Sequence, residues 1–203
     1  PAYGAIKELV ERGEIGSPVA ALACRLVSHR RLGQGWHFDP ERGGGALLDL
    51  HIHDLDFLYS VLGRPQRVHT LGVRSSNGTY DHVFSSLDYE DTKAVAEASF
   101  RMPAGYPVTF YFRLLGNRGC AEYRFVGRSL DSEGSDENEL MVYVPSQQPY
   151  RVALPGLNAF VAEIEYFVTC LLDGRPPSMA SLPDARAVLE IYVAARKSVL
   201  TGQ

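Results

Sequence analysis

The chain has 203 residues, of which 45% are hydrophobic and 22% are charged, and its formal net charge is −4. This composition is typical of a globular protein of one generous domain, and the weak negative charge argues against nucleic acid as a partner. No apolar run approaches the roughly 20 residues that a membrane span requires. Three widely spaced cysteines, Cys24, Cys120 and Cys170, indicate reduced thiols in a cytoplasmic protein.

The first 63 residues predict two helices separated by a strand and a loop. Apolar residues at helical spacing predict a helix over residues 3–12, and a strand follows over residues 18–29. The Gly-, Pro- and charge-rich segment 30–44 is predicted to be a loop. Residues 46–62 carry an apolar stripe at i, i+3 and i+4 that ends before Gly63, so we predict a helix there.

From residue 66 to about 153 the apolar period changes to two. Six strand-like runs are separated by Gly, Asn, Asp and Pro, and their short connections indicate antiparallel pairing. Helical patterns return over residues 157–173 and from the N-cap Ser181 to about 200. The predicted fold class is α+β, an open and mainly antiparallel sheet with helices packed on one face. A broad apolar second face would be covered by another subunit.

The segment from Gly43 to Asp56 carries the residues that suggest chemistry. Three consecutive glycines open the predicted helix, which would leave backbone N–H groups exposed to a ligand. On a continuous helix Asp49 and His53 lie one turn apart and project together. A carboxylate beside an imidazole makes the ring more basic, so the pair could take a proton from a sugar hydroxyl while hydride leaves the same carbon. His51 points to the opposite side of the helix.

The same residues allow other interpretations. A core histidine held by a neighbouring aspartate is common architecture, and the chain could then be a non-catalytic dimerisation or ligand-sensing module. A metal-dependent hydrolase or lyase could use His53 with Asp49 and His29. His51 and His53 diverge on a helix, however, so we expect no metal. The glycine triplet does not follow a strand and is therefore no dinucleotide fingerprint.

The pattern Gly-Gly-Gly-x-Leu-x-Asp-x-x-x-His-x-x-Asp, from Gly43 to Asp56, resembles the signature of the glucose–fructose oxidoreductase, inositol dehydrogenase and rhizopine-catabolism (Gfo/Idh/MocA) family. The opening residues and the closing helices are similar to that family as well. The resemblance implies an N-terminal Rossmann domain, absent from this chain, that binds NAD or NADP. Residues 1–203 would form the α+β domain that binds a sugar or polyol and makes a homodimer or tetramer through its sheet face.

The resemblance also implies roles for individual residues. His53 would be the general base on the substrate hydroxyl, Asp49 would orient His53 or hold the substrate, and Asp56 would support the helix. His29 and Arg31 resemble the stretch that supplies polar substrate contacts. Three aromatic residues are further candidates for the substrate site because a ring there could stack on a sugar: Trp36, His37 and Tyr106.

One residue of the family's site has no counterpart. The family's catalytic lysine lies in a Glu-Lys-Pro motif of the Rossmann domain, and Lys7, Lys93 and Lys197 do not match it. We therefore expect an NAD(P)-dependent oxidoreductase of which this chain is the substrate-binding half. By itself the chain is expected neither to bind a dinucleotide tightly nor to turn over.

Overall fold

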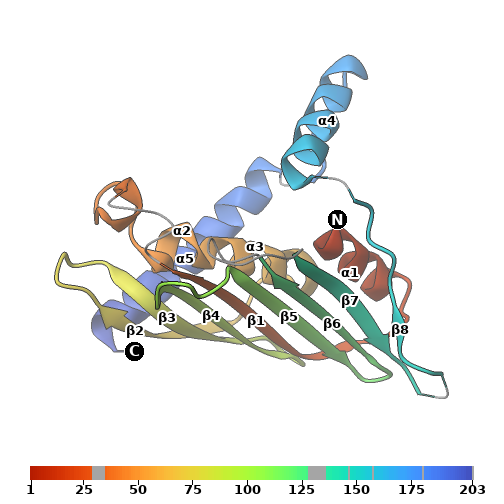
Figure 1. The fold of residues 1–203 in the computed structure, drawn as a ribbon, viewed down its shortest axis with the longest axis horizontal. Coiled ribbons are helices and arrows are strands. Elements are labelled where there is room, and N and C mark those ends of the chain that lie inside the picture. Colours follow the sequence, from red (N-terminus) through yellow and green to blue (C-terminus); the bar gives the residue numbers. More distant parts are fainter. Residues whose placement is uncertain (29–34, 128–135, 146, 157, 180, 203) are drawn as a thin grey trace.

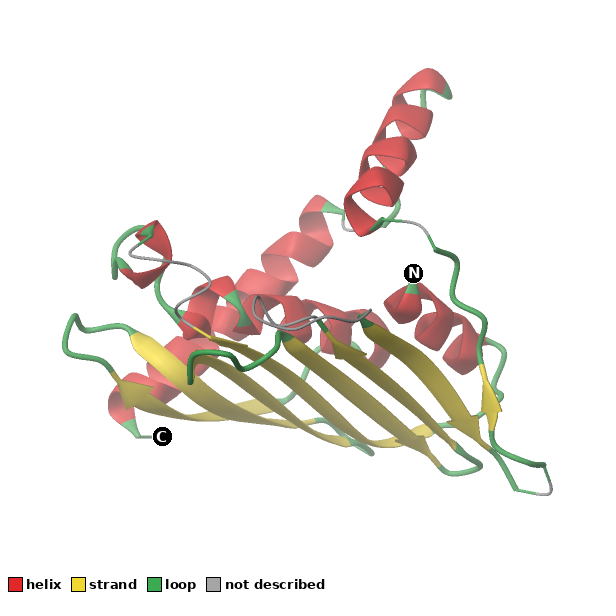
Figure 2. Ribbon diagram, viewed as in Figure 1, coloured by secondary structure: helices red, strands yellow, loops and turns green. Residues whose placement is uncertain are grey.

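The structure is a computed structural model that describes residues 1–28, 35–127, 136–145, 147–156, 158–179 and 181–202. One eight-stranded sheet runs through the described part, and α1, α3 and α5 lie on one of its faces (Figures 1 and 2). In chain order the elements are α1 (Ala2–Glu11), β1 (Pro18–Ser28), η2 (Trp36–Phe38), α2 (Ala46–Asp49), α3 (His51–Leu62), β2 (Arg67–Arg74), β3 (Tyr80–Asp88), β4 (Lys93–Met102), β5 (Thr109–Gly116), β6 (Cys120–Val126), β7 (Glu137–Tyr143), β8 (Tyr150–Arg151), α4 (Ala159–Leu172) and α5 (Leu182–Thr201).

The strand order is β2-β3-β4-β1-β5-β6-β7-β8. β1 lies in the middle of the sheet, where it pairs parallel with β4 and antiparallel with β5. All the other neighbouring strands pair antiparallel. The predicted fold class is therefore confirmed. The parallel pairing of β1 with β4 was not predicted. It is possible because helices and two strands separate β1 from β4 in the sequence.

Alternation along the strands places small apolar side chains against the helices. On β4, Ala94 and Ala96 are buried, whereas their neighbours Lys93 and Val95 are exposed. Leu55 and Leu58 of α3 and Ile6 of α1 belong to the same core cluster, and each is 0% exposed. Burial of each such leucine stabilises the fold by roughly 1.5–3 kcal/mol. The sheet thus fixes the position of α3, which carries the candidate base His53.

The helices at the chain ends begin and end within about two residues of their predicted bounds. α5 starts with a capping box, in which Ser181 Oγ accepts from the Asp184 N–H and the Asp184 carboxylate accepts from the Ser181 N–H. The side chain of Asn158 caps α4. α4 projects away from the sheet (Figure 2), and Cys170 is its one buried residue.

The helix predicted over residues 46–62 is divided into α2 and α3. Leu50 lies between them, and the N–H of His53 donates to the Leu50 carbonyl at 3.2 Å. This i→i+3 bond is tighter than the α-helical i→i+4 bond and interrupts the regular ladder. The prediction of one continuous helix is therefore wrong at Leu50. That Asp49 and His53 project together stays a prediction.

Candidate active site

The glycine segment packs closely against its neighbours, and two of its positions admit no larger side chain. A Cβ atom at Gly43 would lie 2.4 Å from the Trp36 carbonyl oxygen. Gly45 has φ +70°, which side chains rarely adopt, and its Cβ would lie 2.9 Å from the Tyr80 carbonyl oxygen. These glycines let the turn at Trp36 approach α2 and the start of β3.

The backbone N–H groups of the glycines are already bonded. Gly43 and Gly44 both donate to the Asp39 carbonyl at 2.9 Å, and Gly45 donates to the His37 carbonyl at 3.0 Å. The prediction that the triplet offers free N–H groups to a ligand is therefore wrong. The glycines serve the site by close packing of the backbone instead.

The packed turn brings three predicted site residues together. Nδ1 of His37 lies 3.2 Å from Oδ2 of Asp49, and each side chain is 23% exposed. The ring of Trp36 stacks on that of His37 with their centroids 4.1 Å apart, and Trp36 is 49% exposed. Asp49 thus holds His37, and the exposed indole offers an aromatic surface beside the pair.

His53 lies on the side of α3 that faces away from the sheet. Its side chain is exposed, as is that of Asp56, whereas His51 and Asp54 on the other side of the helix are buried. Within the described part of the chain no hydrogen bond joins His53 to Asp49, whose carboxylate bonds His37 instead. His53 is therefore open to an incoming molecule.

Electrostatic surroundings favour the neutral form of His53. Partial burial lowers the pKa of His53 below its ordinary value of 6.5, and the positive charge of Arg25 lowers it further. Asp54, Asp49 and Asp56 act in the opposite direction. Because the net direction is downward, the imidazole is unprotonated at neutral pH and can accept a proton.

A buried ion pair beneath α3 was not predicted. Arg25 Nε and Nη2 donate to the two carboxylate oxygens of Asp54, each at 3.0 Å. One signal for it was present in the sequence, since Arg25 is the single charged residue in the otherwise apolar β1. A charge in a central strand needs a partner, and Asp54 is the acidic residue on the buried side of the helix that follows.

His51 lies on the side of α3 opposite to His53, as predicted, and there it takes part in a chain of buried polar groups. Its Nε2 lies 2.8 Å from Ser85 Oγ, which lies 2.7 Å from Thr70 Oγ1. The Thr70 N–H donates to Ser198 Oγ at 2.9 Å. The chain therefore joins α3 to β3, β2 and α5 through hydrogen bonds across the core.

Three other predicted substrate residues have different outcomes. His29 and Arg31 lie outside the described residues. Tyr106 lies half-buried in the connection between β4 and β5, where its N–H donates to the Pro103 carbonyl at 3.1 Å. Its assignment to the substrate site stays a prediction.

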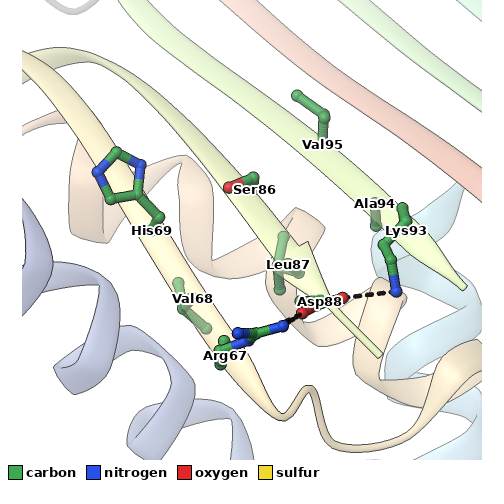
Figure 3. Close-up of a pocket in the computed structure, with 9 residues that line it drawn as sticks. All are labelled: Arg67, Val68, His69, Ser86, Leu87, Asp88, Lys93, Ala94 and Val95. Carbon is green, nitrogen blue, oxygen red and sulfur yellow. Dashed lines mark hydrogen bonds and ion pairs between the residues drawn. The ribbon is translucent and has the colours of Figure 1, made fainter. Parts of the chain in front are cut away.

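A hollow of about 660 Å³ lies over β2, β3 and β4, away from these residues (Figure 3). The Arg67 and Lys93 side chains both contact the Asp88 carboxylate at its rim, the Lys93 Nζ at 2.6 Å. The hollow contains none of the predicted site residues. We therefore place the candidate site at α2, α3 and the turn at Trp36.

The described residues offer neither a metal cluster nor a membrane span. No group of three or more His, Cys, Asp and Glu side chains is placed there to hold a metal ion. No helix in the described ranges has both the length and the apolar character to cross a membrane.

Comparison with known proteins identifies the family. Residues 3–122, more than half of the chain, match the GFO/IDH/MocA C-terminal domain. The chain belongs to this family. The resemblance seen in the segment from Gly43 to Asp56 is thereby confirmed, because the match includes that whole segment.

The relatives of this GFO/IDH/MocA domain are sugar and polyol oxidoreductases. It is 23% identical to a scyllo-inositol 2-dehydrogenase (NAD(+)) of Bacillus subtilis (strain 168), over 100% of this chain and 58% of the relative. It also resembles the solved aldose-aldose oxidoreductase of Caulobacter crescentus in complex with glycerol (TM-score 0.79, 18% identity, 99% of this chain and 59% of the other). A levoglucosan dehydrogenase in complex with NADH and L-sorbose is similar (TM-score 0.75, 18% identity, 96% and 60%). The chain thus spans about three fifths of the length of these proteins.

Proposed function

We propose that this chain is the substrate-binding domain of an NAD(P)-dependent oxidoreductase that oxidises a hydroxyl group of a sugar or polyol. The observation that carries the proposal is the placement of His53. It is the histidine of the family's motif, it is exposed on α3, and its pKa is lowered. These are the properties that a general base needs at neutral pH.

The side chains around His53 have distinct parts in this proposal. His53 accepts the proton of the hydroxyl group that is oxidised. A nicotinamide ring, when bound beside the substrate, supplies the acceptor for the hydride of the same carbon. Asp49 holds His37, which leaves one His37 ring nitrogen for a second hydroxyl. Trp36 gives the apolar face of the sugar a surface to stack on.

We infer that NAD or NADP is bound mainly by a Rossmann domain outside these 203 residues. The described residues include no glycine-rich turn that leads from a strand into a helix, which a dinucleotide site of this kind needs. The exposed side of α3 with His53 and Asp56 is open to such a partner. By itself the chain is then inactive, because the cofactor and the family's lysine come from the other domain.

Asp49→Asn is expected to lower kcat/KM of the complete oxidoreductase by about tenfold or more, because the amide is neutral and holds His37 less firmly. The measurement is steady-state kinetics on a panel of polyols and aldoses. A rise confined to KM would make Asp49 a binding residue only, and wild-type kinetics would remove it from the site. Asp91→Asn, in the exposed turn between β3 and β4, is the control.

We also propose that the chain forms a homodimer or tetramer through the outer face of the sheet, the face turned away from α3. Large apolar side chains on six strand positions are at least 40% exposed there, which is unusual for a surface that stays in water. These residues are Leu71, Val73, Phe84, Val95, Leu115 and Tyr143.

The free thiols Cys24 and Cys120, both part-buried, suit a reducing cytoplasm.

Phe84→Glu is expected to convert the assembly to a monomer, because it buries a charge within the apolar outer face. Sedimentation velocity at micromolar concentration measures this. Arg186→Glu, at an exposed position of α5 on the other side of the sheet, should leave the assembly unchanged. A wild-type chain that sediments as a monomer throughout the concentration range would contradict the proposed interface.

A further inference from the structure

Arg25 connects the central strand of the sheet to the helix that carries the candidate base. Its two bonds to Asp54 are parallel and equal in length, 3.0 Å each. The two side chains are only 11% and 2% exposed. A guanidinium and a carboxylate that share two bonds are fixed in relative orientation, unlike a pair that shares one. The pair therefore ties the first turn of α3 to β1.

Two aromatic side chains enclose the guanidinium. Arg25 Nη2 donates to the Tyr3 hydroxyl at 3.4 Å, and the guanidinium carbon lies 4.3 Å from the centroid of the Phe110 ring. Burial of two charges costs solvation energy that their attraction often fails to recover, so apolar residues of the same size would hold β1 to α3 at least as well. Stability alone thus gives no reason for this pair.

Three carboxylates act electrostatically on His53, and one of them belongs to the next residue, Asp54. Asp54 and Asp56 come from the same helix, and Asp49 comes from α2. The negative charge of Asp184 on α5 raises the pKa of Asp56. Nearby negative charges favour the protonated imidazolium. In that form the ring could not take a proton from a substrate.

Burial is the largest cause that lowers the pKa of His53, and the positive charge of Arg25 lowers it further, against these carboxylates. We propose that Arg25 is a positioning residue for the oxidation proposed above: paired with Asp54, it orients the turn of α3 that presents His53 and keeps that imidazole free to accept a proton. Arg25 acts through His53 and does not contact the substrate. The inference rests on the proposed function, but its electrostatic part can be measured without turnover.

The titration of His53 in the 203-residue chain tests this inference. Histidine ring signals are followed by NMR against pH in the wild type and in Arg25→Met and Arg25→Lys. Loss of the charge is expected to raise the pKa of His53, whereas Arg25→Lys keeps the charge and stays near the wild type. Arg113→Met removes an exposed arginine from the opposite face of the sheet and should change nothing.

A folding defect in Arg25→Met does not end the test. The double variant Arg25→Met with Asp54→Leu replaces the ion pair by apolar side chains, which restores packing. It removes two opposing charges together, so the pKa of His53 should rise less than in Arg25→Met. An unchanged His53 titration in a folded variant that lacks Arg25 but keeps Asp54, Arg25→Met or Arg25→Gln, overturns the inference.

Activity measurements separate this inference from the proposed function. In the complete oxidoreductase, Arg25→Met should move the acidic limb of the kcat/KM profile to higher pH by the same amount as the His53 titration. If His53→Ala stays fully active, the proposed function fails while the electrostatic pairing stands. If the titration and the profile do not move in Arg25→Met, the role of Arg25 fails while that of His53 stands.

Discussion

Replacement of His53 by alanine is expected to lower kcat of the complete oxidoreductase by ~10²–10⁴, the usual contribution of a general base. The change should leave the fold intact, because His53 is exposed and no hydrogen bond joins it to another described side chain. Circular dichroism and a thermal melt verify folding, and steady-state kinetics at saturating cofactor give kcat. The loss should be greatest at low pH, where hydroxide does least to replace the missing base.

His69→Ala is the matched control for this experiment. His69 is also an exposed histidine, but it lies on β2, beside the hollow of Figure 3. Its replacement should leave kcat unchanged. If His53→Ala is as active as this control, His53 is not the base. The dimerisation or ligand-sensing module would then describe the chain better than an enzyme domain does.

Acid is expected to destabilise the chain through His51, a fully buried histidine. Burial lowers the pKa of His51 from the ordinary 6.5 to about 4, and the charge of Arg25 acts in the same direction. The unfolded chain therefore binds a proton at higher pH than the folded chain. The stabilisation is complete above pH 6.5 and is lost as the pH falls from there to about 4, at a cost of about 3 kcal/mol.

Urea unfolding at pH 7 and at pH 4.5 measures this effect. His51→Gln removes the titrating ring, so its free energy of unfolding should fall less between the two pH values than that of the wild type. His69→Gln removes an exposed histidine and should follow the wild type. Equal pH dependence in His51→Gln and the wild type would show that His51 is accessible to protons in the folded chain.

The sequence was sufficient for the layers of the fold because local rules decide them. An apolar period of two predicts a strand with one buried face, and the capping box at Ser181 predicts the start of a helix. The place of β1 between β4 and β5 follows from long-range pairing, which no local pattern encodes. The exposure of His53 could be predicted from helix geometry alone, since His51 and Asp54 occupy the sheet side of α3.

The partners within the site could not be predicted in the same way. The carboxylate of Asp49 bonds His37 because the 3₁₀ turn at Trp36 packs against α2. This packing depends on backbone contacts of Gly43, Gly44 and Gly45. The sequence pattern had predicted that the N–H groups of these glycines contact a ligand. The pair of Arg25 and Asp54 joins residues 29 positions apart, and its one visible signal was the lone charge in β1.

A crystal structure of the complete oxidoreductase with a polyol substrate and the nicotinamide cofactor is the most direct measurement. We expect the hydroxyl group that is oxidised to lie within about 2.6–3.2 Å of a His53 ring nitrogen, with the sugar beside Trp36 and His37. A substrate bound elsewhere, for example in the hollow at Asp88, with His53 in contact with solvent alone, would contradict the assignment of this site.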